Sequence, residues 1–400
     1  MKIKVGIIFG GRSGEHEVSL VSATSVRNEM PKDKYELREI GISKDGKWYM
    51  ENDTYTGDDG NNGNDGNNNN NGLIEKFKDG SYTEMTSVSF DAALNGCDII
   101  FSVLHGPYGE DGTIQGVFEM MNLPYVGCGV LASSLCMDKI NAKRVLSECG
   151  IPVVPYVAFS RTEWMTTDAL NVNDPNANNP NANDSNSKSF TRETIIEKIK
   201  KELSLPLFIK PSNMGSSVGI SKVKEWEELE SAVDEACKYD TRILVEKGVD
   251  AREIECAVLG NDDPKAASLG EIVVGGEFYD YNDKYVDGKS HPEIPVKNLN
   301  AETQAKICDF CLRGYKALGC SGLSRVDSFI DRKTGEIYLN EINTLPGFTS
   351  ISMYPKMWAN SGIAFPDLLD QLIQLGFEKF KEKSSNKIGF DLSSDWFKTP

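Results

Sequence analysis

The chain has 400 residues, of which 39% are hydrophobic and 26% are charged, a composition typical of globular proteins with two or three domains. Its formal net charge of −17 disfavours nucleic acid or an anionic membrane as the main partner, because phosphate groups attract lysine and arginine. A nucleotide held in a local basic pocket is still compatible with this charge.

The apolar run at 5–9 is too short for a signal peptide and ends in glycines, so it predicts a first buried strand. No stretch of about 18 apolar residues is present, and no transmembrane helix is expected. The nine cysteines are scattered, which favours free thiols and a reducing, cytoplasmic compartment. Cys308 and Cys311 have CxxC spacing within a predicted helix. Without a second pair, buried or partly exposed thiols are favoured over a zinc or redox site.

Residues 1–128 form a first block with an α/β pattern. Strands are expected at 4–9, 35–42 and 99–104, and a helix at about 18–30. Within this block, residues 52–72 are almost all asparagine, aspartate and glycine. Such a segment buries too little apolar surface to offset the entropy lost on ordering. It is interpreted as a surface loop rather than a functional element.

Residues 129–245 form a second block, which an Asn-rich segment at 168–187 interrupts in the same way. The expected elements are, in chain order, helix 137–149, helix 192–203, strand 205–210, strand 218–223 and helix 225–237.

Residues 246–377 form the third block, and the polar residues 378–400 are expected to be a frayed tail. The expected elements are strands 253–259 and 269–274, a polar loop 278–295, helix 301–318, hairpin 323–343 and an amphipathic helix 365–377. A loop this long within a domain is typical of a lid that excludes water from a reactive site. Its candidate functional residues are Lys284 and Tyr285, and a surface loop with exposed aromatic residues is the alternative.

The strongest chemical feature is the predicted hairpin. Each of its strands carries two polar residues two positions apart, namely Arg325 with Asp327 and Glu341 with Asn343. Because side chains alternate between the faces of a strand, each pair shares one face. If the register brings these faces together, their oxygen atoms suit Mg²⁺ and the arginine suits a phosphoryl group in transfer. The alternative is a solvated hairpin face without a ligand. The turn at Gly347 just after the hairpin argues against this alternative, because it can direct backbone N–H groups into the same site.

A second feature is the segment 210–219, in which a lysine at the end of an apolar strand precedes a loop of glycines and serines. Small residues allow backbone amides to approach a phosphate closely, so Lys210, Ser216 and Ser217 are candidates for nucleotide binding. The segment is not a P-loop, because no Lys-Ser/Thr pair and no helix follow the glycines. A strand–loop–strand flap over phosphates is favoured, and an ordinary hairpin loop is the alternative.

Three shorter segments carry further candidates. Residues 246–249 end an apolar strand where backbone groups suit an adenine edge, and Glu253 is placed to hold ribose hydroxyls, although a generic strand end is equally consistent. The glycine turn at 10–14 lacks GxGxxG spacing, so a helix start that presents Glu15 to an ammonium group is favoured over a dinucleotide site. The polar loop from His105 follows a predicted strand, and ligands bind in such loops.

Taken in order, these segments resemble the D-alanine–D-alanine ligases of the ATP-grasp superfamily. The matching motifs are GGRSGEHEVSL, HGPYGEDGTIQG, MDKINAK, LPLFIKPSNMGSSVGISKV, VEKGVDAREIECAVLG, FYDYNDKY, SRVDSFID and NEINTLPGFTSISMYP. They cover nearly the whole chain apart from the Asn-rich segments and the tail. The resemblance implies a mixed α/β and α+β chain, with a doubly wound substrate-binding α/β domain followed by a two-lobed ATP-grasp fold.

The resemblance also implies residue roles, with ATP between the second and third blocks. The implied ATP-binding residues are Lys139, Lys210, Ser216, Ser217, Glu246, Lys247, Val249, Glu253 and Lys284. The implied ligands of two Mg²⁺ or Mn²⁺ ions are Asp327, Glu341 and Asn343. The implied substrate-binding residues are Glu15, His105, Arg325, Gly347, Ser352 and Met353, and the implied catalytic residues are Glu15, Ser216, Tyr285, Arg325, Gly347 and Ser352.

In the implied reaction, the carboxylate of one D-alanine attacks the γ-phosphate of ATP. The amine of a second D-alanine then displaces phosphate, and the dipeptide serves peptidoglycan synthesis. Arg325 and the metal would offset the developing charge, and the Gly347 N–H would join Arg325 in an oxyanion site. A network of Glu15, Ser216 and Tyr285 would tie the lid to the other domains.

The lid bears on the second substrate. Related depsipeptide ligases that use D-lactate carry a histidine in place of the Lys-Tyr pair, whereas Lys284 and Tyr285 are both present here, which favours D-alanine. D-Serine or D-lactate as second substrate is one alternative, and an inactive nucleotide-binding regulator is another. The complete set of motif residues argues against the regulator. The resemblance further implies small-molecule substrates and a homodimer, without nucleic acid or membrane partners.

Overall fold

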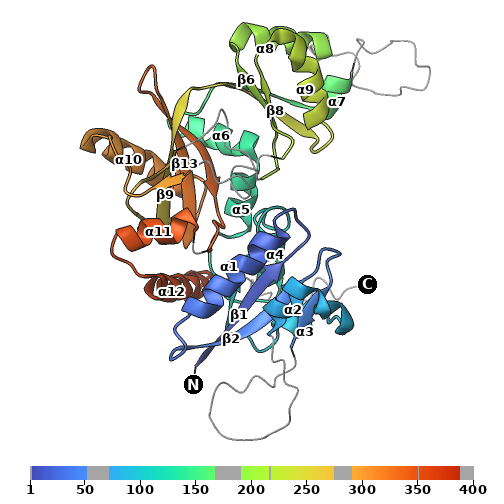
Figure 1. Cartoon of the computed structure of the whole chain (residues 1–400), viewed down its shortest axis with the longest axis vertical. Helices are drawn as coiled ribbons and strands as arrows, with labels where there is room; N and C mark the ends of the chain where they lie inside the picture. Colours follow the sequence, from blue (N-terminus) through green and yellow to red (C-terminus); the bar gives the residue numbers. More distant parts are fainter. Residues whose placement is uncertain are drawn as a thin grey trace, which may run out of the picture.

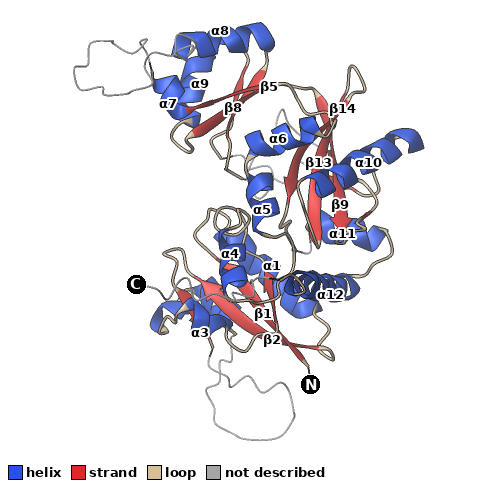
Figure 2. Ribbon diagram, turned by 180° about the vertical axis from the view of Figure 1, so that it is seen from behind, coloured by secondary structure: helices blue, strands red, loops and turns tan. Residues whose placement is uncertain are grey.

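The computed structural model describes residues 2–51, 72–166, 191–215, 218–273, 291–349 and 351–387. In these residues, three β-sheets with their covering helices are arranged along the long axis of the molecule, and the third sheet in the sequence lies between the other two (Figures 1 and 2). Apart from Gly72, the Asn-rich segments lie outside the described residues, as does most of the predicted lid. The candidates Ser216, Ser217, Lys284 and Tyr285 also lie outside them, so their roles stay predictions.

The first sheet has the strand order β3-β2-β1-β4, and its central strand β1 is parallel to both neighbours. Its strands are β1 (Ile3–Gly10), β2 (Tyr35–Ile42), β3 (Trp48–Met50) and β4 (Ile99–Ser102). Ile7 packs in one buried cluster with helix α1 (His16–Glu29), while its neighbour Ile8 packs in another with α4 (Thr113–Met120). Burial on both faces explains why β1 is a continuous apolar run, and it confirms the predicted α/β fold.

The second sheet is antiparallel, with the order β5-β8-β6-β7. Its elements are β5 (Tyr156–Ser160), β6 (Leu207–Pro211), β7 (Ser221–Val223) and β8 (Arg242–Lys247), with helices α7 (Arg161–Met165), α8 (Arg192–Glu202) and α9 (Leu229–Ala236). The predicted helix 225–237 begins instead as a short 3₁₀ turn, Trp226–Glu228. The Glu228 carboxylate accepts hydrogen bonds from the backbone N–H groups of Lys224 and Glu225, which caps this turn.

The third sheet has the order β12-β11-β9-β13-β14, and β10 pairs with β9. Its strands are β9 (Ala251–Leu259), β10 (Lys265–Ala266), β11 (Gly270–Val273), β12 (His291–Glu293), β13 (Leu323–Asp331) and β14 (Ile337–Asn343). Helices α5 (Val130–Met137), α6 (Lys139–Glu148) and α10 (Ala301–Ala317) contribute to one buried cluster with this sheet. The last part of the predicted polar loop 278–295 is a short strand, β12, because these residues pair with β11.

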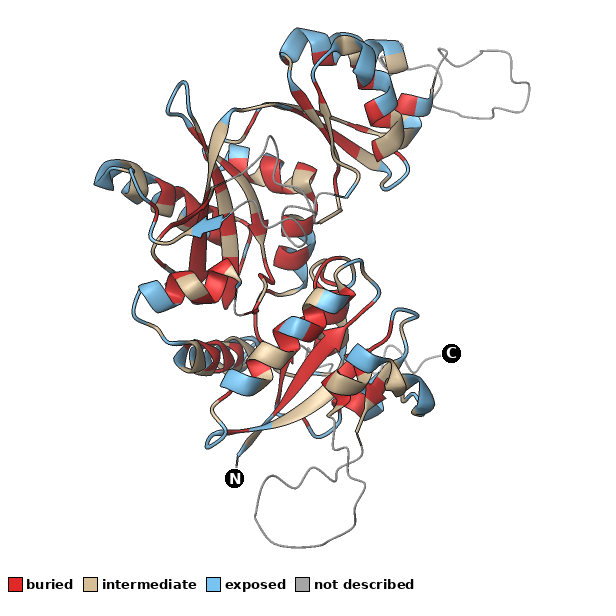
Figure 3. Cartoon of the chain, in the orientation of Figure 1, coloured by how far each residue is buried: buried red, intermediate tan, exposed pale blue. Residues whose placement is uncertain are grey.

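The last helix returns to the first sheet. Helix α12 (Phe365–Ser384) contacts α1 and β4, and its buried leucines share a cluster with Ile7. Figure 3 shows that burial is concentrated on the sheets and on the helix faces that cover them. The helix was predicted to end at residue 377, but it continues to Ser384. The expectation of a frayed tail from residue 378 was therefore wrong for residues 378–384. The proposed domain boundaries stay a prediction.

Two further expectations concern membranes and cysteines. In the described part of the chain, no helix is both long enough and apolar enough to cross a membrane. All nine cysteines are free thiols, and Cys311 is buried in α10 while Cys308 is partly exposed. The interpretation of the CxxC pair as thiols of a helix agrees with these positions.

Candidate active site

A pocket of about 1160 Å³ is lined by strands of the second and third sheets, by helices α1 and α6, and by the loop that follows β4. Every predicted site residue that the structure describes lies on its wall. These residues are Glu15, His105, Lys139, Lys210, Glu246, Lys247, Val249, Glu253, Arg325, Asp327, Glu341, Asn343, Gly347, Ser352 and Met353. Residues from distant parts of the sequence therefore share one cavity.

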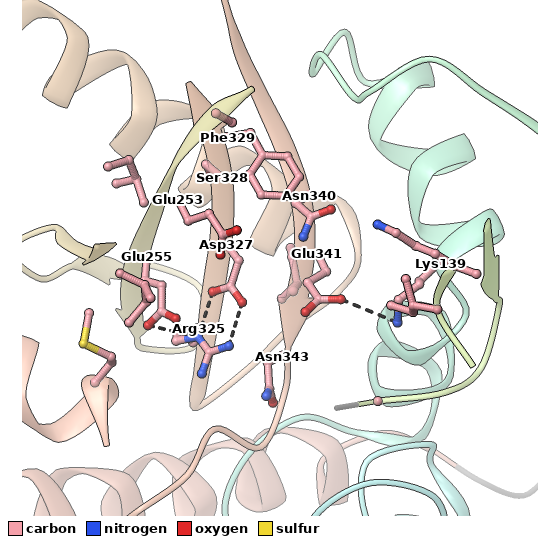
Figure 4. Close-up of a pocket in the computed structure, with 18 of the residues that line it drawn as sticks. Lys139, Glu253, Glu255, Arg325, Asp327, Ser328, Phe329, Asn340, Glu341 and Asn343 are labelled. Carbon is pink, nitrogen blue, oxygen red and sulfur yellow. Dashed lines mark hydrogen bonds and ion pairs between the residues drawn. The ribbon is translucent and has the colours of Figure 1, made fainter. Parts of the chain in front are cut away.

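The β13–β14 hairpin forms one wall of this pocket (Figure 4). The antiparallel register pairs Arg325 with Asn343 and Asp327 with Glu341. A register shift follows directly between Asp327 and Ser328, so the polar set ends where the regular pairing is interrupted. The two polar pairs predicted from the sequence thus lie opposite each other on adjacent strands.

Arg325 is held between two carboxylates. Its Nε and Nη2 donate to the two oxygens of Asp327 at 2.7 and 2.6 Å, and Nε lies 3.3 Å from an oxygen of Glu255. Burial disfavours the charged guanidinium, but Asp327 and Glu255 outweigh this effect and raise the pKa of Arg325 well above its ordinary value. The guanidinium is therefore a fixed positive charge that faces the pocket.

The oxygen atoms of this wall fit a hard divalent cation. Asp327, Glu341 and Asn343 offer two carboxylates and one amide oxygen, and Mg²⁺ is commonly bound by one or two carboxylates and completed by water and phosphate. Within the described ranges, no three His, Cys, Asp or Glu side chains come together as a metal site. A metal ion here would complete its coordination with oxygen atoms of water and phosphate.

Lys139 faces the hairpin from helix α6. Its Nζ lies 3.5 Å from Glu341 Oε2 and donates to the Met214 carbonyl at 2.8 Å (Figure 4). The preceding Asp138 caps the helix by accepting from the Asn141 N–H at 2.9 Å. This cap explains why α6 begins at residue 139 rather than at the predicted residue 137, and it fixes the start of the helix that carries Lys139. The separate helix α5 before it was not predicted.

Glu246 lies between two lysines at the back of the pocket. Lys143 Nζ is 2.6 Å from its Oε1, and Lys210 Nζ forms an ion pair with its Oε2. Burial raises the pKa of the Glu246 carboxyl, but Lys143 and Lys210 together outweigh it and lower this pKa to about 2. Burial opposes the charge of Lys210 as well, yet Glu246 raises its pKa above the ordinary value. Both groups are charged at neutral pH.

The N-terminal domain contributes Glu15 and His105. Glu15 directly precedes α1, and a Cβ atom on Gly106 would lie 2.9 Å from its Oε2, so a side chain at residue 106 would displace this carboxylate. The His105 ring is within hydrogen-bonding distance of Ser22 Oγ at 3.0 Å and the Leu345 carbonyl at 3.2 Å. Burial lowers the pKa of His105, but Glu110 at 3.6 Å outweighs it and raises the pKa.

Ser352 and Met353 lie at the start of helix α11 (Met353–Asn360). The Ser352 hydroxyl accepts from the Thr349 N–H at 3.0 Å, and a Cβ atom on Gly347 would lie 2.8 Å from it. A helix N-terminus offers unpaired backbone N–H groups and a positive dipole end, which together favour a carboxylate. This part of the pocket therefore suits the acidic end of a small substrate.

Comparison with known proteins places the whole chain in one family. The family model described as "D-ala D-ala ligase N-terminus" matches residues 4–128, and the model described as "D-ala D-ala ligase C-terminus" matches residues 180–374. The chain belongs to the D-alanine–D-alanine ligase family. The ATP use implied by the family fits the positively charged side chains of Lys139 and Lys210 that line the pocket.

Relatives and solved structures match over nearly the full length. A D-alanine–D-alanine ligase of Thermoanaerobacter pseudethanolicus is 46% identical over 96% of this chain and 98% of its own. One of Acetivibrio thermocellus is 43% identical over 95% of this chain and 97% of its own. The VanG D-Ala:D-Ser ligase from Enterococcus faecalis is 37% identical with a TM-score of 0.74, over 94% of this chain and 100% of its own. The Coxiella burnetii D-alanine–D-alanine ligase is 33% identical with a TM-score of 0.74, over 96% of each chain.

Among the charged residues of this ligase-family site that sequence reasoning missed are Lys143 and Glu255. Lys143 lies four residues after Lys139 on α6, and this spacing places both lysines on one face of a helix, which was a usable signal. Glu255 lies two residues after Glu253 on β9, and alternation places both on one face of the strand. Their importance depends on partners in other elements, Glu246 and Arg325, which no local pattern indicates.

Proposed function

We propose that this protein joins two D-alanine molecules into D-alanyl-D-alanine for peptidoglycan synthesis, with conversion of ATP to ADP and phosphate. The observation that carries the proposal is the single pocket that combines the hairpin wall, the lysines around Glu246 and the N-terminal Glu15. Relatives that are 43–46% identical over at least 95% of this chain bear the name D-alanine–D-alanine ligase, which supports the same assignment.

ATP is proposed to bind at the end of the pocket that β6, β8 and α6 form. Lys139 and Lys210 would contact its phosphates, since both ammonium groups face the cavity and lysine neutralises phosphate charge. Glu246 and Lys247 at the end of β8, and Val249 just after it, would surround adenine. Glu253 would hold the ribose. The segment that contains Ser216 and Ser217 and the predicted lid with Lys284 belong to the same proposal.

Asp327, Glu341 and Asn343 are proposed to hold two Mg²⁺ or Mn²⁺ ions. Their oxygen donors and their position opposite Lys139 support this assignment. When bound, such metal ions neutralise charge on the phosphates and hold them in place for attack.

In the first step, a carboxylate oxygen of the first D-alanine attacks the γ-phosphorus, the bond to the bridging oxygen breaks, and ADP leaves. A carboxylate is a poor acceptor for an amine, and the phosphate group that it gains is a leaving group. Glu15 would bind the ammonium group of this substrate, and His105 would help to seat it. Arg325 would act as a fixed cation beside the reacting carboxylate.

In the second step, the amine nitrogen of the second D-alanine attacks the acyl carbon, and phosphate leaves with the electrons of the carbon–oxygen bond. Arg325 and the Gly347 N–H would stabilise the oxyanion that forms at the carbonyl oxygen. Ser352 and the Met353 N–H would bind the carboxylate of this second substrate. Tyr285, with Glu15 and Ser216, is proposed to assist the loss of the amine proton.

The deciding experiment is an acceptor panel with product identification. The protein is incubated with ATP, Mg²⁺ and D-alanine, alone or with D-serine or D-lactate, and the products are identified by mass spectrometry at several pH values. ATP-dependent release of phosphate with D-alanyl-D-alanine as the main product is expected. Release with another acid but not with D-alanine would contradict the proposal, and tight ATP binding without turnover would favour an inactive regulator.

A D-alanine–D-serine ligase is the second candidate, because the D-Ala:D-Ser ligase from Enterococcus faecalis is 37% identical over 94% of this chain. In the same panel it predicts D-alanyl-D-serine as the main product of the mixed reaction. A cytoplasmic location and a homodimer are also part of our proposal. The nine free thiols support the location, and light scattering of the purified protein tests the assembly.

A further inference from the structure

Lys143 is one turn of α6 beyond Lys139, yet its side chain is only 2% exposed and does not line the pocket. Its Nζ lies 2.6 Å from Glu246 Oε1, while the other oxygen of the same carboxylate binds Lys210. One carboxylate therefore joins a lysine of helix α6 to a lysine of strand β6. Of these three groups, Glu246 and Lys210 reach the cavity, and Lys143 supports them from behind.

The cluster carries one more positive than negative charge. Glu246 is also 2% exposed, so its carboxylate lies where water cannot replace a lost partner. Removing one partner from a buried ion pair leaves the other charge uncompensated, which is strongly unfavourable. If Lys143 were absent, Glu246 would depend on Lys210 alone and would hold it in place. With Lys143 present, Lys210 can leave without exposing Glu246 as an isolated buried charge.

We propose that Lys143 is a positioning residue that keeps the Glu246 carboxylate paired while Lys210 moves from it to a phosphate group of the nucleotide. This inference rests on the proposed ATP site and deepens it. It states that the movement of Lys210 from Glu246 to the nucleotide depends on Lys143, a side chain that does not touch the ligand. Lys143 acts only through Glu246. Its loss affects ligands with phosphate groups and spares the recognition of adenosine.

The test compares ADP and adenosine binding to the full chain and to Lys143→Met, which keeps the length of the side chain and removes its charge. We expect Lys143→Met to bind ADP at least about tenfold more weakly, because Glu246 then retains Lys210. Adenosine, measured by competition, should bind as it does to the unchanged protein. Lys379→Met is the matched control, since Lys379 is a partly buried lysine that contacts the Gly127 carbonyl outside the pocket.

A second substitution separates this role from a purely structural one. Glu246→Gln removes the negative charge that pairs with Lys143 and Lys210, so no buried carboxylate is left to retain Lys210. The ADP affinity of Lys143→Met/Glu246→Gln should therefore lie within about threefold of that of Glu246→Gln alone. This comparison also decides the matter if Lys143→Met alone does not fold, because the double variant removes a balanced ion pair.

Three outcomes would overturn the inference: unchanged ADP affinity in Lys143→Met, an equal loss for ADP and adenosine, or the same loss whether or not the Glu246→Gln substitution is also present. A failure of the proposed function looks different, since the unchanged protein would then bind no ADP at all. Binding of ADP by the unchanged protein together with an unaffected Lys143→Met variant would remove only the role of Lys143.

Discussion

At the level of single residues, Glu341 connects the two sides of the pocket. It pairs with Asp327 in the hairpin and lies 3.5 Å from Lys139 of the facing helix (Figure 4). Glu341 would hold the proposed metal ions together with Asp327 and Asn343, and it supplies one of the two carboxylates in this set. The hairpin turn offers a second glutamate for comparison, Glu336, which is exposed and does not line the pocket.

We predict that Glu341→Gln lowers turnover by more than the roughly 10–100-fold that is typical for loss of an outer-shell partner of a metal site. The amide keeps the shape of the side chain but loses the charge that attracts the cation. Steady-state phosphate release measures the effect, and Glu336→Gln should keep the full rate. Equal activity of the two variants would refute the metal assignment.

The buried Glu246 carboxylate makes the stability of the folded protein depend on pH. Its pKa in the folded protein is about 2, below the ordinary 4.5, so its ion pairs contribute stability that is present above pH 4.5. This contribution, at most about 3 kcal/mol, is lost as the pH falls from 4.5 towards 2. Urea unfolding at pH 6 and pH 3 should therefore show a smaller acid-induced loss for Glu246→Gln than for the unchanged protein. Parallel losses in the two proteins would count against the buried ion pairs.

At the level of elements, helix α12 approaches the first sheet closely because of one glycine. A Cβ atom on Gly376 would lie 2.9 Å from both Ile99 Cδ1 and the Tyr125 carbonyl oxygen. The carbonyl belongs to the backbone and cannot turn away. Gly116, also within a helix, has open space around the position of a Cβ atom.

We predict opposite effects for alanine at these two glycines. Gly376→Ala should destabilise the protein by about 1–3 kcal/mol, because the methyl group forces α12 away from the sheet. Gly116→Ala should stabilise it by about 0.5–1 kcal/mol, because alanine loses less conformational entropy in a helix. Thermal unfolding of both variants measures the difference. Stabilisation by Gly376→Ala would mean that the contact with Tyr125 is looser than described.

At the level of the whole molecule, the two ends of the chain share one core. Leu372 of α12 is fully buried in the cluster that also contains Ile7 and Ile99 of the first sheet. Since this helix follows the third sheet in the sequence, it links the N-terminal domain to the C-terminal part of the chain. The second sheet has its own buried cluster, to which Ile199 of α8 belongs.

Leu372→Ala should therefore destabilise the first sheet, although its strands are far from residue 372 in the sequence. The cavity should cost about 2–5 kcal/mol, and hydrogen exchange followed by mass spectrometry should show faster exchange in β1 and β4. Exchange in β5 and β8 should stay unchanged. Ile199→Ala, an equally buried control, should show the reverse pattern. Faster exchange throughout the molecule in both variants would indicate that the sheets do not open separately.

Much of the fold was predictable because it depends on short-range periodicity. The run around Ile7 and the alternation of Arg325 and Asp327 predict a buried strand and a two-faced hairpin from neighbouring residues alone. Element ends were less predictable, as α6 shows, because the Asp138 cap depends on a particular hydrogen bond. The grouping of the candidate residues in one pocket was recognisable only from the ordered set of motifs, since no single motif indicates which others it will contact.

The sequence by itself determined the order of the elements, the two polar pairs of the hairpin and the family resemblance, because each resides in local residue types and spacing. Only the tertiary structure decided the register of Asp327 with Glu341, the burial of Lys143 against Glu246 and the return of α12 to the first sheet. These features depend on contacts between residues far apart in the chain. The hairpin therefore carried the chemical prediction, and long-range packing completed the site around it.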